Sequence, residues 1–139
     1  TYKLYEKKDE LAQIVLNSNR NVITATNNTN KQFMMSNDFP IFMALIDIAW
    51  FREDVIPITT DVPTGIGAEP YLDRLQKFLN LNNHQDVGLR MIELQKEYWP
   101  EAKREFYPID IEYQSCECRK YFSYVNGTKK FEGKNLFSV

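Results

Sequence analysis

The sequence predicts an α+β fold, in which an N-terminal helix and a β-hairpin precede central helices and a small C-terminal sheet of antiparallel strands. Three observations carry this prediction. Apolar residues recur at helical spacing in several segments, residues 109–114 alternate between apolar and polar side chains, and Asn126-Gly127 between two β-leaning runs is typical of a hairpin turn. The order of helix, hairpin, helices and sheet gives the α+β class.

Length and composition point to a single domain over residues 1–139. The chain is 43% apolar and 26% charged, and its 17 basic and 19 acidic residues give a net charge of −2. That balance excludes a general electrostatic attraction to nucleic acid or anionic membranes. No run approaches the roughly 18 apolar residues of a spanning helix, so we expect no membrane association. Cys116 and Cys118 are too close in sequence to pair, which predicts free thiols and a cytoplasmic location.

The first third predicts one helix and one hairpin. Residues 4–16 carry leucine, isoleucine and valine at helical spacing between charged residues, and Asn17-Ser18-Asn19 ends this helix. Residues 21–26 and 31–36 are rich in β-branched and large apolar side chains. The polar run 27–30 joins them, which predicts a β-hairpin.

The middle third predicts helices. Asp38 as a cap and Pro40 in the first turn begin a helix that runs to about Glu53. Residues 55–62 are interrupted by Pro57 and predict an edge strand or an extended linker, and the glycine-bearing stretch 64–68 is the most flexible part. A third helix begins at Pro70, and Asn83 caps a fourth that ends near Pro100.

The last third predicts strands. Ile109, Ile111 and Tyr113 alternate with polar residues, which is typical of a strand with one wet face. With Asn126-Gly127 as a type I′ turn, Phe122 faces Phe131 across a hairpin. The tail 136–139 can add one more strand.

The leading functional prediction is a non-enzymatic domain that binds another protein. The helix from Pro40 to Glu53 is apolar almost all round, so part of it should be exposed. On a helical wheel, one row places apolar side chains beside carboxylates, as a partner-binding surface would. The row consists of Met43, Asp47, Phe51 and Asp54. The alternative is a buried helix in which a neighbour satisfies Asp47.

A second prediction is binding of single-stranded nucleic acid. Residues 117–139 carry five basic and two acidic side chains, and the basic ones are interleaved with aromatic rings. The candidates on the predicted hairpin are Arg119, Lys120, Tyr124, Lys129 and Lys130. Lysines that protect a sheet edge from aggregation explain the same pattern.

A small metal-dependent nuclease is the third alternative. Asp110 and Glu117 on neighbouring strands could hold Mg²⁺ while Arg119 steadies the attacking water, a pattern that resembles restriction-enzyme-like nucleases. The same three charged residues are also expected on the solvent-exposed face of a strand that has no catalytic role.

The remaining chemical signals are weak. His84 lies in a polar junction typical of a helix end, and no second Cys or His pair accompanies Cys116 and Cys118 as zinc would need. Gly65-Ile66-Gly67 before a helix lacks the third glycine and the Lys-Ser or Lys-Thr pair of phosphate loops. No cofactor is therefore predicted.

Overall fold

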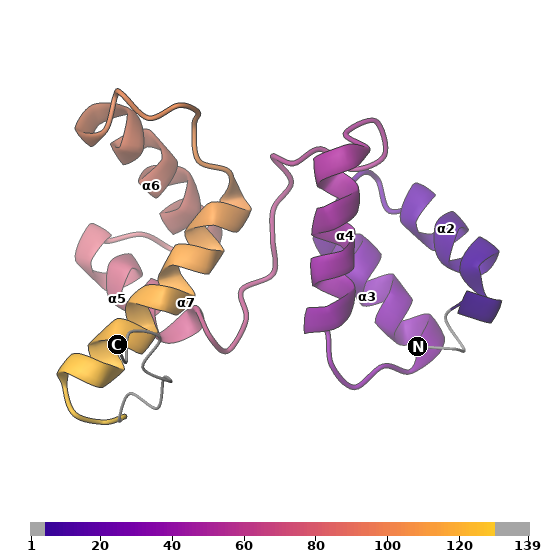
Figure 1. Cartoon of the computed structure of the whole chain (residues 1–139), viewed down its shortest axis with the longest axis horizontal. Coiled ribbons are helices and arrows are strands. Elements are labelled where there is room, and N and C mark those ends of the chain that lie inside the picture. Colours follow the sequence, from indigo (N-terminus) through magenta and orange to yellow (C-terminus); the bar gives the residue numbers. More distant parts are fainter. Residues whose placement is uncertain (1–4, 130–139) are drawn as a thin grey trace, which may run out of the picture.

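The computed structural model describes residues 5–129, which form six α-helices, α2 to α7, and no β-strand (Figure 1). The predicted α+β fold class is therefore wrong for the described part of the chain, which is all-helical. None of these helices combines the length and hydropathy needed to cross a bilayer.

The helices form two groups of three (Figure 1). In the first group, α3 (Val22–Phe33) packs against both α2 (Lys8–Leu16) and α4 (Phe39–Phe51). In the second, α5 (Glu69–Leu79), α6 (His84–Tyr98) and α7 (Pro108–Val125) pack against one another. The segment 52–68 connects the groups, and it contains residues 55–62, which the sequence predicts as an edge strand or an extended linker.

The first predicted hairpin is wrong, because residues 22–33 form α3. Asn21 starts the helix, since its side chain accepts a hydrogen bond from the Thr24 N–H at 2.9 Å. Val22, Ala25 and Thr29 then fall on one buried helical face, and this burial outweighs the β-preference of valine and threonine. The polar run 27–30 is not a turn, because Asn27 and Asn28 lie on the solvent face of the same helix.

The central helices follow the prediction. Asn83 accepts a hydrogen bond from the Asp86 N–H at 2.8 Å and caps α6, and α5 begins beside Pro70. In α4 only the cap differs. The side chain of Asn37 accepts from the Phe39 N–H at 3.1 Å, while the Asp38 carboxylate binds Asn30.

The predicted strand at 109–114 is wrong, because these residues belong to α7. Pro108 occupies the first turn, and the Asp110 carboxylate accepts from the Tyr107 N–H at 2.8 Å, so both suit a helix start. Ile109 and Ile111 are buried in two different cores. On a helix, residues two apart point in nearly opposite directions, so the alternation reflects two cores rather than one sheet face.

The predicted turn at Asn126-Gly127 is a helix end instead. Asn126 follows the last residue of α7, and Gly127 has φ +68°. The Gly127 N–H donates to the Tyr124 carbonyl at 3.0 Å and the Thr128 N–H to the Ser123 carbonyl at 3.0 Å, which is a Schellman motif. The positive φ that indicates a hairpin turn also terminates helices. The predicted partner Phe131 and the tail strand lie outside the described residues.

Two buried cores meet at the first turn of α7. One core joins α2, α3 and α4 with Ile56, Ile58 and Val62 of the linker, and Ile109 completes it. The other joins α5 and α6 around Ile111. Helix α7 therefore contributes side chains to both cores. Its side chains that lie outside the cores can line cavities.

Candidate functional site

A cleft of about 860 Å³ lies between the two helix groups. Its walls are the residues preceding and beginning α4, the linker segment 63–67 and the middle of α7. In Figure 1, α4 and α7 run in roughly opposite directions and diverge toward the end where α4 begins. Apolar contributions come from Phe39, Phe42, Ile66 and Tyr113.

The opposite end of this junction is closed by aromatic contacts. The Trp50 ring on α4 meets Tyr107 edge to face at 5.7 Å between centroids. The Arg104 guanidinium lies 4.7 Å from the Tyr107 ring centre and forms a bidentate ion pair with Asp110 at 2.7 and 2.9 Å. Along the same line the Tyr113 hydroxyl donates to the Met43 sulfur at 3.1 Å. Side-chain contacts therefore close the cleft at one end, and the other end is open.

The linker wall of the cleft is held against α7. A Cβ added to Gly67 would lie 2.7 Å from the Cys116 sulfur, so any larger residue at this position would require the Cys116 side chain to move. The Gly67 carbonyl also accepts from Arg119 Nε at 2.6 Å. The stretch that the sequence marks as most flexible is thus anchored at its second glycine.

Glu112 is the buried ionisable group of the cleft. Its side chain lies beneath the linker, where the Gly65 N–H is its hydrogen-bond donor. Burial raises the pKa of this carboxyl above its usual value, and the Gly65 hydrogen bond opposes the rise only in part. Burial and the negative charge of Glu112 likewise raise the pKa of Tyr113.

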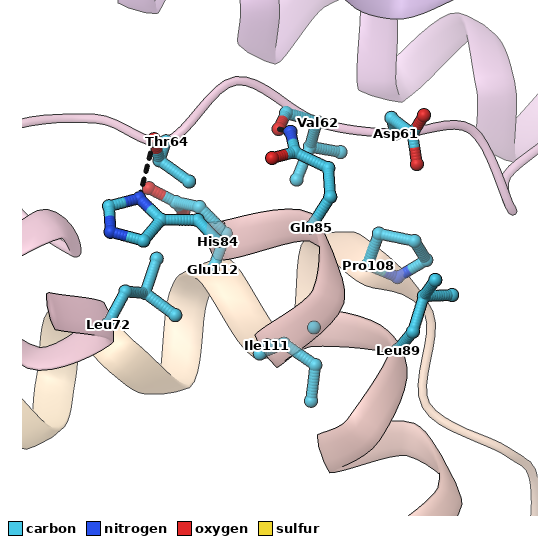
Figure 2. A pocket seen from close by; sticks show the side chains of 11 residues that line it. Asp61, Val62, Thr64, Leu72, His84, Gln85, Leu89, Pro108, Ile111 and Glu112 are labelled. Atoms are coloured by element: carbon cyan, nitrogen blue, oxygen red, sulfur yellow. Dashed lines mark hydrogen bonds between the residues drawn. The ribbon is translucent and has the colours of Figure 1, made fainter. Parts of the chain in front are cut away.

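A smaller pocket of about 30 Å³ lies on the other side of Glu112. Figure 2 shows it under the 61–64 segment, with His84 and Gln85 at the start of α6 and Ile111 and Glu112 on α7. The His84 ring bridges Asp73, at 2.8 Å from Nε2, and Thr64, at 3.3 Å from Nδ1. This volume suits a water molecule rather than an organic ligand. His84 is therefore placed to join α5, α6 and the linker.

The predicted protein-binding row on α4 is divided in the structure. Asp47, Phe51 and Asp54 are exposed, and Phe51 is 86% exposed at the last residue of the helix. Met43 is half-buried and contacts Tyr113 beside the cleft. The row thus runs from the junction of the helix groups to open solvent.

The structure does not bring the nuclease candidates together. Asp110 and Glu117 lie on one helix, two turns or about 10.5 Å apart along its axis, too far to share one metal ion. Asp110 is paired with Arg104, and Glu117 with Lys120 at 2.5 Å. Burial alone would raise the pKa of the Asp110 carboxyl. The hydrogen bonds from Arg104 and from the Tyr107 N–H outweigh burial, so this pKa lies below its usual value. No group of three or more His, Cys, Asp or Glu side chains within residues 5–129 is arranged for a metal.

The nucleic-acid candidates lose the shared sheet face on which they were predicted. Arg119, Lys120 and Tyr124 lie along the last turns of α7, where Lys120 faces the cleft and Arg119 reaches the linker. Lys129 is exposed just beyond the helix, and Lys130 lies outside the described residues.

The two cysteines also point apart. Cys116 lines the cleft against Gly67, while Cys118 lies beside Tyr71 of α5. Burial, together with this thiol, raises the pKa of Tyr71. Both cysteines are free thiols, as the sequence predicts.

Sequence reasoning missed Phe39 and Glu112, and it included Ile66 only as part of the flexible stretch 64–68. Phe39 is 57% exposed and Ile66 is 88% exposed, and both line the cleft. A phenylalanine before an N-terminal proline and an isoleucine between two glycines are local signals of exposed apolar side chains. Glu112 carried no signal, because its burial depends on the position of the linker.

Comparisons of this chain with protein-family models, with curated proteins and with solved structures found no match. Any function therefore has to be argued from the geometry of the chain itself.

Proposed function

We propose that this chain is a protein-binding domain whose cleft takes a cationic, partly apolar segment of a partner protein. The observation that carries the proposal is the lining of the cleft. It joins the apolar side chains of Phe39, Phe42, Ile66 and Tyr113 to four carboxylates and one amino group. The charged residues are Asp38, Glu69, Glu112, Glu117 and Lys120.

The charge of the cleft selects the kind of partner. Lys120 is paired with Glu117, so it neutralises one carboxylate and leaves the lining negative. A negative cavity attracts lysine and arginine side chains and repels a phosphate backbone. This favours a basic segment of a protein over nucleic acid at this site.

The apolar residues supply the driving force. Phe39 and Ile66 are more than half exposed, so covering them removes apolar surface from water without repacking the core. A cavity of about 860 Å³ lies within the range that holds a drug-sized ligand or a few side chains. The occupant is therefore a short segment rather than a large flat surface.

The test uses two synthetic amphipathic peptides of equal length, one built from leucine and lysine and one from leucine and glutamate. Fluorescence anisotropy should show binding of the lysine peptide, weakened as salt rises, and none of the glutamate peptide. Because a negative protein can attract basic peptides weakly anywhere, a matched pair of variants locates the binding. Phe39→Ala removes an aromatic wall of the cleft, whereas Phe78→Ala removes an 85% exposed phenylalanine of α5 that does not line it.

Phe39→Ala should weaken binding about tenfold, which corresponds to about 1.4 kcal/mol, and Phe78→Ala should leave it unchanged. Circular dichroism confirms that both variants are folded. Equal binding by the two variants, or equal affinity for the two peptides, would contradict the proposal.

A further inference from the structure

A third cavity, also lined by α7, has the opposite chemistry from the cleft. It measures about 260 Å³ and lies between the first turns of α5 and the last turns of α7. Among the residues that the structure describes, its lining includes Arg74 and Arg119 but no aspartate or glutamate. The cavity is therefore a positive site on a chain whose net charge is −2.

The two guanidinium groups are not neutralised by any described carboxylate. Arg52, Arg90 and Arg104 each form an ion pair, at 2.7, 2.9 and 2.7 Å. Arg119 instead uses Nε to bind the Gly67 carbonyl, and Arg74 lies 5.9 Å from the centre of the Phe122 ring. The terminal nitrogens of both arginines thus remain able to donate to an anion, and two guanidinium groups that line one cavity suit a phosphate.

The same cavity contains a stack of aromatic rings. Tyr71 of α5 and Phe122 of α7 lie nearly parallel, with centroids 5.9 Å apart and planes inclined by 20°. Both rings line the cavity, and Phe122 is partly exposed. A further planar ring can stack on such a pair, as nucleobases stack on aromatic side chains of proteins.

We propose that this cavity binds a nucleotide unit, with its phosphate between Arg74 and Arg119 and its base against the Tyr71–Phe122 stack. The volume fits one such unit rather than a length of strand. A free mononucleotide and the phosphorylated 5′ end of a single strand present the same chemistry. The site is separate from the cleft, so it stands whether or not the cleft binds protein.

Isothermal titration calorimetry with adenosine monophosphate, adenosine and inorganic phosphate tests the two halves of the site on the full chain. We expect adenosine monophosphate to bind at least tenfold more tightly than either of the other two, because only it engages both arginines and rings. The affinity should fall with rising salt, since a phosphate contact is screened.

Arg74→Gln is the decisive variant. The Arg74 side chain is exposed and, unlike that of Arg119, is not hydrogen-bonded within residues 5–129 to a backbone carbonyl that the substitution would leave without its donor. It should weaken nucleotide binding at least tenfold. Arg90→Gln, which removes an exposed arginine of α6 outside the cavity, is the matched control and should leave binding unchanged. Absence of nucleotide binding at millimolar concentration, or equal loss in both variants, would overturn the proposal.

A 5′-phosphorylated oligonucleotide and its 5′-hydroxyl counterpart distinguish the two sources of the ligand. Tighter binding of the phosphorylated strand than of the mononucleotide assigns the site to strand ends, and the reverse order assigns it to free nucleotides. Equal binding of the two oligonucleotides, with no mononucleotide binding, would contradict a site for a terminal phosphate.

Discussion

Ile109→Ala should destabilise both helix groups together, because the first turn of α7 is shared by their cores. Ile109 is 1% exposed and completes the core of α2, α3 and α4, while Ile111, two residues on, belongs to the core of α5 and α6. Loss of packing around Ile109 loosens the start of α7, and the position of Ile111 depends on that start. The expected result is one cooperative unfolding transition for the whole chain.

The magnitude follows from the burial. Truncating a fully buried isoleucine to alanine costs about 2–5 kcal/mol, from lost transfer energy and the cavity left behind. A chain of 139 residues has a stability of about 7–20 kcal/mol. Ile109→Ala therefore removes a measurable fraction without unfolding the protein. Ile66→Ala deletes the same atoms from an 88% exposed side chain and should change stability by less than about 0.5 kcal/mol.

The chain provides one tryptophan for each group. Trp50 contacts Tyr107 at the end of α4, and Trp99 contacts Phe106 just after α6. Urea unfolding followed by fluorescence in Trp99→Phe and Trp50→Phe backgrounds reports the two groups separately. Ile109→Ala should lower the midpoint equally in both. A shift at Trp50 with an unchanged transition at Trp99 would refute the shared core and show two independently folding units.

Two further predictions concern single side chains. Glu112→Gln should raise stability at neutral pH and flatten its pH dependence. Burial raises the pKa of Glu112 in the folded state, so the folded protein favours the protonated carboxyl. The free energy of unfolding of the wild type therefore falls as pH rises from the ordinary carboxyl range through the folded pKa. A steeper decline with pH in Glu112→Gln would contradict a raised pKa at Glu112. Phe51→Asp should change the unfolding free energy by no more than about 1 kcal/mol, because Phe51 is already 86% exposed; loss of the folded state in a thermal melt would place this residue in the core.

The sequence predicted those elements whose signals are local. Asn83 caps α6 and Pro70 begins α5, because a cap and a fixed φ act within one turn of chain. The apolar helix that the sequence predicts from Asp38 to about Glu53 corresponds to α4, and two of its apolar side chains, Trp50 and Phe51, are exposed.

One missed element, α7, begins with the local signals Pro108 and Asp110, but the alternation of apolar residues suggested a strand instead. Other missed features are decided by distant contacts. Residues 22–33 combine β-branched side chains with a buried face that helical spacing also satisfies, and only packing against α2 and α4 selects the helix. The cleft could not be predicted either. It depends on how the linker lies against α7, which Glu112 and Arg119 determine through contacts with Gly65 and Gly67.

The charge pattern of the C-terminal third shows why the net charge of a segment does not predict the charge of its binding sites. Along the sequence, Asp110, Glu112 and Glu117 come before Arg119 and Lys120, and residues 117–139 sum to a basic segment. On α7, helical spacing sorts them: Glu112 and Glu117 face the cleft, whereas Arg119 joins Arg74 on a different face. Opposite charges only two residues apart thus serve cavities of opposite sign. A bound ligand interacts mainly with charges within a Debye length of about 8 Å. It therefore senses the charges on the nearby face of the helix rather than the net charge of the segment. Each site therefore needs its own variant, Phe39→Ala for the acidic cleft and Arg74→Gln for the basic cavity.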